Sequence, residues 1–366
     1  MNHVVRSFVL TLALLATAAH AGEKKKDDPL PPRKIVSLDP RFDKLVAKDA
    51  VVETIARGFI WTEGVAWSKE TTSVQTRRGL FGRIIQRQIV TREPGFLVFS
   101  DIPNNVVHKW QDGQVSVFVK PSGYTGKEPR GGKPGDEPGS NGLLFDAQGR
   151  LTLCEHGDRR VSRIERDGSK TTLADSYEGK KLNSPNDLVY HSNGDLYFTD
   201  PPYGRPKWEK DPSLELGYFG VFLRKANGKL ILLTKEMTRP NGIALSPDEK
   251  TLYVANSDFA APIWKSFQVK EDGTVGEGTL FVDGMKWVKD KRPGLPDGMK
   301  IDMHGNIWAT GPGGVWVFSP KGEVLGNIDT GTNTANVCFG DDGTTLYIAA
   351  NHDICRVRTL TRGKGF

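Results

Sequence analysis

The stretch Ser184-Pro185-Asn186-Asp187-Leu188-Val189-Tyr190, followed by Gly194-Asp195-Leu196-Tyr197-Phe198-Thr199-Asp200, contains the pattern that decides the fold. A polar residue opens a short apolar strand, a Gly- or Asp-rich turn follows, and a second strand then alternates apolar and polar side chains. The pattern begins at five other places, at intervals of 39 to 78 residues. Its six opening residues are Glu63, Asn141, Asn186, Asn241, Asp297 and Asn336.

Repeats that each contain several short strands are typical of a β-propeller. A third strand usually follows the first two, as at Arg160–Ile164, and a fourth follows where the sequence has room for it. The chain is therefore predicted to be all-β, a six-bladed β-propeller of four-stranded blades. Residues 45–59 alternate without a hairpin partner, so we expect this N-terminal segment to supply the outer strand of the last blade and to close the ring. A TIM barrel would need amphipathic helices between its strands, and no segment shows a convincing helical period.

The first 21 residues have the features of a secretory signal peptide. Arg6 precedes the apolar run 8–16, and Ala19-His20-Ala21 is a small-residue cleavage site. The run is too short to span a bilayer, and no other run approaches the length needed. We expect residues 1–21 to be removed, 22–43 to be flexible and 44–366 to form the propeller. The mature protein is then exported without a membrane span, and periplasmic and extracellular destinations both stay open.

Charge and cysteine content argue against two other classes of protein. The formal net charge is +6, or +5 once Arg6 is removed, which is mild for 366 residues and does not indicate a nucleic-acid partner. Cys154, Cys338 and Cys355 are odd in number and have no Cys-x-x-Cys spacing, so we expect buried, unreactive thiols. The oligomeric state cannot be predicted from these features.

All six opening residues carry a carbonyl or carboxylate oxygen. Because the first strand of a propeller blade is innermost, equivalent positions form a ring around the axis. Two carboxylates with neutral amide oxygens suit Ca²⁺, with Mg²⁺, Mn²⁺ or Zn²⁺ as substitutes. The competing interpretation is that the Asn-Gly and Asp-Gly pairs are ordinary turns, but Glu63 is not a turn residue.

The chain resembles the senescence-marker-protein/gluconolactonase/luciferin-regenerating-enzyme family over about residues 44 to 360. The resemblance rests on six motifs: Trp61-Thr62-Glu63-Gly64, Phe99-Ser100-Asp101-Ile102-Pro103-Asn104-Asn105, Ser184-Pro185-Asn186-Asp187-Leu188, Phe198-Thr199-Asp200-Pro201-Pro202-Tyr203-Gly204, Arg239-Pro240-Asn241-Gly242-Ile243 and Leu295-Pro296-Asp297-Gly298-Met299. Bacterial gluconolactonases look most similar, through Cys154-Glu155-His156-Gly157. The resemblance implies a catalytic divalent metal held by Glu63, Asn186, Asn241 and Asp297, and a lactone substrate.

A lactonase needs an electrophile on the carbonyl and an activated water, and one metal can serve both needs. Asp297 or Glu63 is the expected base, although a carboxylate bound to a metal is a weak one. His156, Asp187 or Asp200 could share that role. We expect Asn141, Asp187, Asp200, Tyr203 and Asn336 to contact the substrate.

Two features depart from the family pattern. Val65 stands where the family usually has Pro, and about residues 70–91 form a basic insertion in the first blade. The insertion could extend a hairpin, cover the mouth of the active site or meet a partner. Two other long loops, 121–140 and 203–216, are candidate lids or plain surface loops.

Two other functions stay open beside a calcium-dependent lactonase. One is a phosphotriesterase or aryl-ester hydrolase on the same site, and the other is a non-enzymatic, calcium-binding propeller. The chain has neither a GxSxG nor a GxxxxGK[ST] motif, which leaves serine hydrolase and P-loop functions without support.

Overall fold

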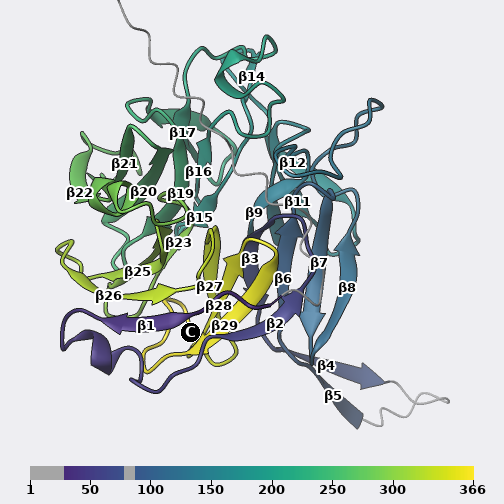
Figure 1. The fold of residues 1–366 in the computed structure, drawn as a ribbon. Helices are drawn as coiled ribbons and strands as arrows, with labels where there is room; N and C mark the ends of the chain where they lie inside the picture. The colour runs from purple at the N-terminus through teal and green to yellow at the C-terminus, as the bar shows by residue number, and fades with distance from the viewer. Residues whose placement is uncertain (1–28, 78–86) are drawn as a thin grey trace, which may run out of the picture.

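The computed structural model describes residues 29–77 and 87–366, and its ribbon is shown in Figure 1. The predicted signal peptide, residues 1–21, lies outside the described residues. Within the described part the chain forms six β-sheets around a common axis, as the repeat predicts. Each of these sheets is antiparallel and contains four or five strands.

The blades follow one another in chain order. The first contains β3 (Thr62–Ser68), β6 (Phe96–Asp101), β7 (Val106–Gln111) and β8 (Gln114–Val119), and the second β9 (Ser140–Phe145), β10 (Leu151–Glu155), β11 (Arg160–Ile164) and β12 (Lys170–Ala174). The third contains β15 (Leu188–Tyr190), β16 (Leu196–Asp200), β17 (Gly220–Arg224) and β18 (Leu230–Thr234), and the fourth β19 (Pro240–Leu245), β20 (Thr251–Asp258), β21 (Ala261–Gln268) and β22 (Thr279–Asp283). The fifth contains β23 (Met299–Ile301), β24 (Ile307–Gly311), β25 (Gly314–Phe318), β26 (Val324–Asp329) and β1 (Lys34–Ser37), and the sixth β27 (Asn336–Gly340), β28 (Thr345–Ala350), β29 (Asp353–Arg358) and β2 (Glu53–Arg57).

The remaining described elements are short. Two hairpins stand apart from the blades, β4 (Thr71–Arg77) with β5 (Arg87–Glu93) and β13 (Ser176–Tyr177) with β14 (Lys180–Lys181). The described helical turns are η1 (Phe42–Lys44), η2 (Trp208–Lys210) and α1 (Met285–Lys289). None of them is long and apolar enough to cross a membrane.

The ring closes as predicted, through an N-terminal strand. Strand β2 pairs with β29, with Glu53 opposite Arg356, and so completes the sixth blade. The fifth blade contains one strand that was not predicted from the sequence. Strand β1 pairs with β26, with Lys34 opposite Asp329. Residues 34–37 were expected to belong to a flexible segment, but they form the outer, fifth strand of the fifth blade. The physical reason is that β26 would otherwise be an uncovered edge.

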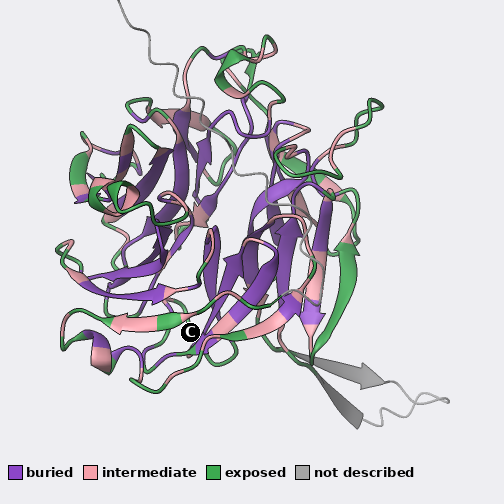
Figure 2. Cartoon of the chain, in the orientation of Figure 1, coloured by how far each residue is buried: buried purple, intermediate pink, exposed green. Residues whose placement is uncertain are grey.

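The core lies between the blades. Alternate strand residues pack against the neighbouring sheet, and the large side chains there are fully buried, including Trp264, Trp308 and Trp316. Each such side chain contributes about 1.5–3 kcal/mol by burial. Figure 2 shows the buried residues concentrated in the strands near the axis and the exposed residues on outer strands and loops. The three cysteines are all buried and unpaired, which confirms the prediction for them.

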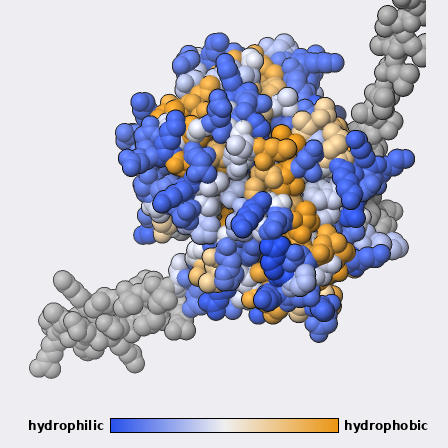
Figure 3. Space-filling view, turned by 90° about the vertical axis from the view of Figure 1, so that its left-hand side faces the viewer, coloured by the Kyte–Doolittle hydropathy of each residue, from blue (hydrophilic) through white to orange (hydrophobic). Residues whose placement is uncertain are grey.

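The outer surface is mostly polar. Figure 3 shows one side of the molecule, where polar residues surround several smaller apolar areas. Exposed apolar side chains such as Phe259 and Leu280 occur on this fold, but single exposed residues of that kind are normal for soluble proteins. This surface is in keeping with the mild net charge of the chain.

The insertion in the first blade forms the β4–β5 hairpin, with Thr71 opposite Glu93. It projects away from the blades in Figure 1. It leaves the sheet after Ser68, at the end of β3, whereas Glu63 stands near the start of the same strand. Five residues of strand separate the two by about 16 Å. The described part of the hairpin therefore emerges at the opposite end of the inner strand from the predicted site, which argues against the alternative in which the insertion covers the active-site mouth.

Candidate metal centre and active site

The six opening residues lie where the repeat predicts them, at or just before the start of each inner strand. Glu63, Asn141 and Asn336 are in the first two residues of β3, β9 and β27, and Asn241 is the second residue of β19. Asn186 and Asp297 each precede an inner strand by two residues. All are buried except Asp297, which is partly exposed. These positions share one mouth of the propeller axis.

The glycine after four of these residues is required by the neighbouring blade. A Cβ atom on Gly64 would lie 1.9 Å from the carbonyl oxygen of Asn141, and one on Gly242 would lie 2.1 Å from that of Asp297. One on Gly298 would lie 2.3 Å from the amide carbon of Asn336. Gly142, Gly242 and Gly298 do not have a positive φ. The recurring Gly therefore lets adjacent inner strands approach each other, so the interpretation as ordinary turns does not hold for these three residues.

Hydroxyl groups fix the register between blades at this mouth. Thr199 Oγ1 donates to the carbonyl of Asn241 at 2.7 Å, and Thr310 Oγ1 donates to that of Ala335 at 2.9 Å. Ser100 Oγ donates to the carbonyl of Asn141 at 2.9 Å, and Ser257 Oγ donates to Pro296. Each hydroxyl comes from the second strand of one blade and binds the opening segment of the next. These hydroxyl residues were not predicted from the sequence, although a Ser or Thr recurs near the end of these second strands.

Several buried polar atoms without partners lie at the same mouth. Among the described residues, both side-chain atoms of Asn186 lack a hydrogen bond, as do Asp297 Oδ1 and Asn141 Oδ1. Burying an unpaired polar atom costs about 1–3 kcal/mol, so such atoms usually have a missing partner. A hard cation held by carboxylate and amide oxygens would supply it.

The donor set fits a cation of this kind. Asn241 Nδ2 donates to Ser257 Oγ at 2.9 Å, which orients the amide and leaves its Oδ1 oxygen for another partner. The described residues contain no group of three His, Cys, Asp or Glu side chains that could hold a metal. Two carboxylates and two amides form the implied set, so Ca²⁺ suits it better than a zinc cage of nitrogen and sulfur ligands.

The two carboxylates of this set destabilise each other's charge. Burial, together with the charges of Asp187 and Glu137, raises the pKa of Glu63 to about 8. Burial also raises the pKa of Asp297 well above its ordinary range, and the charges of Glu63, Asp187 and Glu137 add to the effect. Carboxylates brought together without a counter-ion hold protons that a cation would displace.

Asp187 and Asn336 stand beside the carboxylates in the channel. Asp187 Oδ1 accepts from the N–H of Leu188 at 2.9 Å, whereas Oδ2 is buried without a partner. Burial raises the pKa of Asp187, and the Lys300 cation opposes that rise. Asn336 Oδ1 accepts from the N–H of Val337 at 2.9 Å. Both residues are close enough to the metal set to bind the substrate, and that role stays a prediction.

Asp200 and Tyr203 have structural partners of their own. Asp200 accepts the N–H groups of Asn183 and Ser184, each at 2.8 Å, so it holds the segment that leads to Asn186. A contact between Asp200 and the substrate is still only a prediction. Tyr203 is buried, packs edge-on against Trp208, and has a pKa raised by burial and by the charge of Asp297. Tyr203 therefore lies within electrostatic reach of the metal set.

His156 is fully buried, and neither ring nitrogen has a hydrogen-bond partner among the described residues. Its Nδ1 lies 3.6 Å from Oε2 of Glu137 in the loop 121–140. Burial lowers the pKa of His156 to about 3, and the Arg130 and Arg205 cations contribute. Glu137 could not be predicted from the sequence, because nothing in the repeat or in the family motifs marks a residue of this loop.

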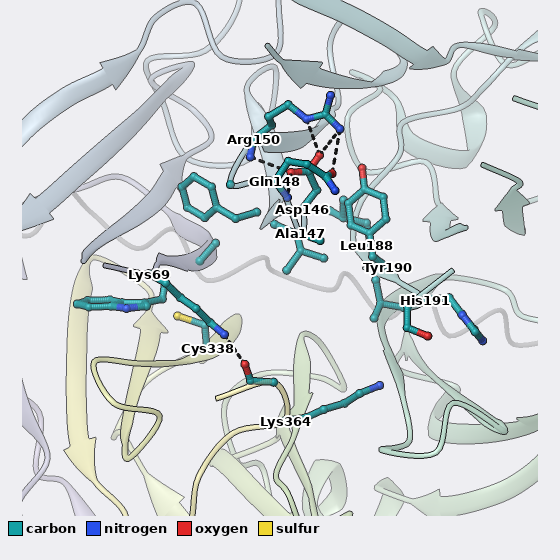
Figure 4. A pocket seen from close by; sticks show the side chains of 18 of the residues that line it. Lys69, Asp146, Ala147, Gln148, Arg150, Leu188, Tyr190, His191, Cys338 and Lys364 are labelled. Atoms are coloured by element: carbon teal, nitrogen blue, oxygen red, sulfur yellow. Dashed lines mark hydrogen bonds and ion pairs between the residues drawn. The ribbon is translucent and has the colours of Figure 1, made fainter. Parts of the chain in front are cut away.

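A cavity of about 1440 Å³ lies at the opposite mouth of the axis. Its walls include the far ends of the inner strands, such as Trp67, Phe145 and Phe339, and its side chains are shown in Figure 4. None of the predicted site residues lines it. This cavity and the predicted site therefore lie at opposite ends of the channel, and the buried oxygens of Asn141, Asn186 and Asp297 that lack partners lie at the predicted site.

The fold and the site together define a six-bladed propeller with a ring of carboxylate and amide oxygens at one mouth of its axis. The SMP-30/gluconolactonase/LRE-like family model matches residues 61–352, and the chain belongs to this family, as its motifs indicated.

Three similar proteins illustrate the relationship. The gluconolactonase of Zymomonas mobilis is 39% identical over 336 residues, which cover 90% of this chain and 87% of that protein. The solved gluconolactonase of Xanthomonas campestris is 28% identical, with a TM-score of 0.69 and coverage of 91% of this chain and 99% of that one. A calcium-binding regucalcin from Agrobacterium tumefaciens shares the fold at 16% identity, with a TM-score of 0.59 and coverage of 93% and 97%.

Proposed function

We propose that this protein is an exported hydrolase that opens a sugar lactone at a divalent-metal site on the propeller axis, with Ca²⁺ as the preferred ion. The observation that carries the proposal is the convergence of Glu63, Asn186, Asn241 and Asp297 at one mouth, with buried oxygens that lack partners. The similarity to the Zymomonas mobilis gluconolactonase supports the substrate class, because it extends over most of both chains.

The chain's own residues would perform four tasks. Glu63, Asn186, Asn241 and Asp297 would hold the ion, which supplies polarisation of the lactone carbonyl and a lowered pKa for water. Asn141, Asp187, Tyr203 and Asn336 would orient the substrate's hydroxyl groups. The hydroxyls of Ser100, Thr199, Ser257 and Thr310 keep the ligand positions in register. The glycines after the opening residues have no side chain, so the inner strands of adjacent blades can approach closely and the metal ligands stay near one another.

The test begins with metal analysis of the purified protein, followed by hydrolysis assays with and without a chelator. The panel is glucono-δ-lactone, an aryl lactone, an aryl ester and an organophosphate, each with added Ca²⁺ and with the spontaneous rate subtracted. We expect sugar-lactone hydrolysis that a chelator abolishes and Ca²⁺ restores. Turnover of the organophosphate or aryl ester alone would instead support the alternative hydrolase. Metal binding without turnover of any compound would indicate a non-enzymatic propeller.

The position of the β4–β5 hairpin predicts that it is dispensable for this activity. Replacing residues 72–92 by Asn-Gly would join Thr71 to Glu93, which already face each other across the hairpin. We expect kcat/KM for the lactone to stay within about twofold of the wild type, because the hairpin emerges at the other end of β3. Steady-state kinetics and metal titration would check this expectation. A tenfold loss of kcat/KM in a folded variant would mean that the hairpin reaches the site.

A further inference from the structure

The loop 121–140 is fixed to the first blade at both ends. Asn105 Oδ1 accepts N–H groups from Ser122, Gly123 and Tyr124 at 3.0, 2.8 and 3.1 Å. At the other end, the N–H of Gly139 donates to the carbonyl of Ile102 at 3.1 Å. The loop is therefore an anchored part of the structure, and its side chains have defined positions.

The middle of the loop is tied to the third blade. Arg130 Nη2 donates to Asp136 Oδ1 at 2.9 Å and to the carbonyl of Gly204 at 3.1 Å. Asp136 Oδ2 accepts from the N–H of Gly131 at 2.6 Å. These contacts hold the carboxylate of Asp136, and the next residue is Glu137.

Glu137 lies beside His156, and its loop leads directly into Asn141 at the start of β9. Its Oε2 lies 3.6 Å from His156 Nδ1, and its charge raises the pKa of Glu63 and of Asp297. Its side chain is about 20% exposed, which leaves it a path to water. Glu137 and Asp187 are both carboxylates that the implied coordination does not use. Asp187 is buried, at 2% exposure, whereas Glu137 comes from a loop outside the ring of opening residues and reaches solvent.

We propose that Glu137 is the general base of lactone hydrolysis and that His156 is its positioning residue. The inference rests on the proposed function. Glu137 accepts a proton from water as the water oxygen bonds to the lactone carbonyl carbon. The ring C–O bond then breaks, and the proton passes from Glu137 to the departing ring oxygen, so that the product is the hydroxy acid. A carboxylate that does not coordinate an ion keeps the basicity that Glu63 and Asp297 would lose.

His156 is built to orient a carboxylate without neutralising it. Burial lowers the pKa of the imidazole to about 3, so the ring is neutral and offers a single N–H. The His156 side chain is fully buried and packs against Gly204, so closely that a Cβ added there would be 2.4 Å from His156 Cβ. The main chain of His156 also donates to the carbonyl of Gly139 at 3.2 Å. A distance of 3.6 Å is slightly long for a hydrogen bond, and catalytic contacts often shorten when the substrate binds.

The test is Glu137→Gln, with Glu128→Gln as the matched control on an exposed residue of the same loop. We expect Glu137→Gln to lower kcat by about 10²–10³-fold, with KM and Ca²⁺ affinity changed by less than about threefold. Formate should restore part of the activity of Glu137→Ala, since a small carboxylate can occupy the vacated space. Glu128→Gln should behave as wild type.

A readout that does not depend on activity completes the experiment. In the metal-free protein, the imidazole ¹⁵N resonances of His156 should shift in Glu137→Gln and stay unchanged in Glu128→Gln. A wild-type kcat in Glu137→Gln would overturn the proposal, and so would a loss of activity that accompanies a loss of Ca²⁺ affinity and is not restored by formate. Failure of the wild type to hydrolyse any lactone would overturn the proposed function itself, while the resonances would still test the contact.

Discussion

Asp297→Asn is expected to abolish high-affinity Ca²⁺ binding and to lower kcat/KM for a sugar lactone by about 10³-fold. The substitution keeps the shape of the side chain and removes one of the two charges in the implied ligand set. Polarisation by a metal contributes several kcal/mol to such a reaction, and about 4 kcal/mol corresponds to that loss of rate. Calorimetric Ca²⁺ titration and steady-state kinetics would measure both effects.

The same substitution should stabilise the metal-free protein. Burial, and after it the charges of Glu63, Asp187 and Glu137, disfavours the ionised form of Asp297 and raises its pKa. Removing one charge should therefore raise the Tm measured in the presence of a chelator. Asp290→Asn, an exposed residue of the same region, is the control and should change neither quantity. Metal-dependent activity that persists in Asp297→Asn would contradict the assignment of Asp297 as a metal ligand.

Chelation should destabilise the protein, and more strongly at about pH 8 than at about pH 5. In the metal-free protein, Glu63 has a pKa of about 8, above its ordinary value of 4.5. The folded state then binds more protons than the unfolded state between those values, so the metal-free protein loses stability as the pH rises through that window. Ca²⁺ binds the ionised carboxylates and neutralises the repulsion between them. Its stabilising effect is therefore largest near pH 8, where the carboxylates are most ionised.

The measurement is Tm with chelator and with Ca²⁺ across this pH range, together with Ca²⁺ affinity at each pH. We expect the affinity to fall by up to about tenfold for each unit of decreasing pH, for each proton that the ion displaces. Asp297→Asn should flatten this dependence, because it removes one of the coupled groups. A difference in Tm that is the same at all pH values would mean that the ion does not bind at these carboxylates.

The repeat pattern was enough to predict the fold and most of the candidate site. Alternation of apolar and polar residues is a local property of strands, and six copies of it predict six blades without any knowledge of contacts. The opening residue of each repeat sits at the same place on an inner strand, so symmetry alone brings Glu63, Asn186, Asn241 and Asp297 to one mouth. The closing strand at residues 53–57 was predicted for a similar reason, because its alternation had no partner of its own.

Other features depend on contacts between segments that are distant in the sequence, and a local sequence pattern does not predict such contacts. Strand β1 is ordered because the edge of β26 accepts it, and residues 34–37 have no repeat to mark them. The recurring glycines looked like turn residues, and only the distance to the next blade shows that they permit a close approach. The insertion had three interpretations, and the direction of β3 argues against one of them.

The sequence by itself thus determined the class of fold, the ring of oxygens and the kind of ion that suits it. The tertiary structure alone showed which oxygens at this mouth are buried without partners, and it placed Glu137 and His156 together. The physical reason is that regular strands follow from short-range periodicity, whereas a loop takes its position from long-range contacts such as that between Arg130 and Gly204. A base carried by such a loop could therefore be found only after the blades had been placed around it.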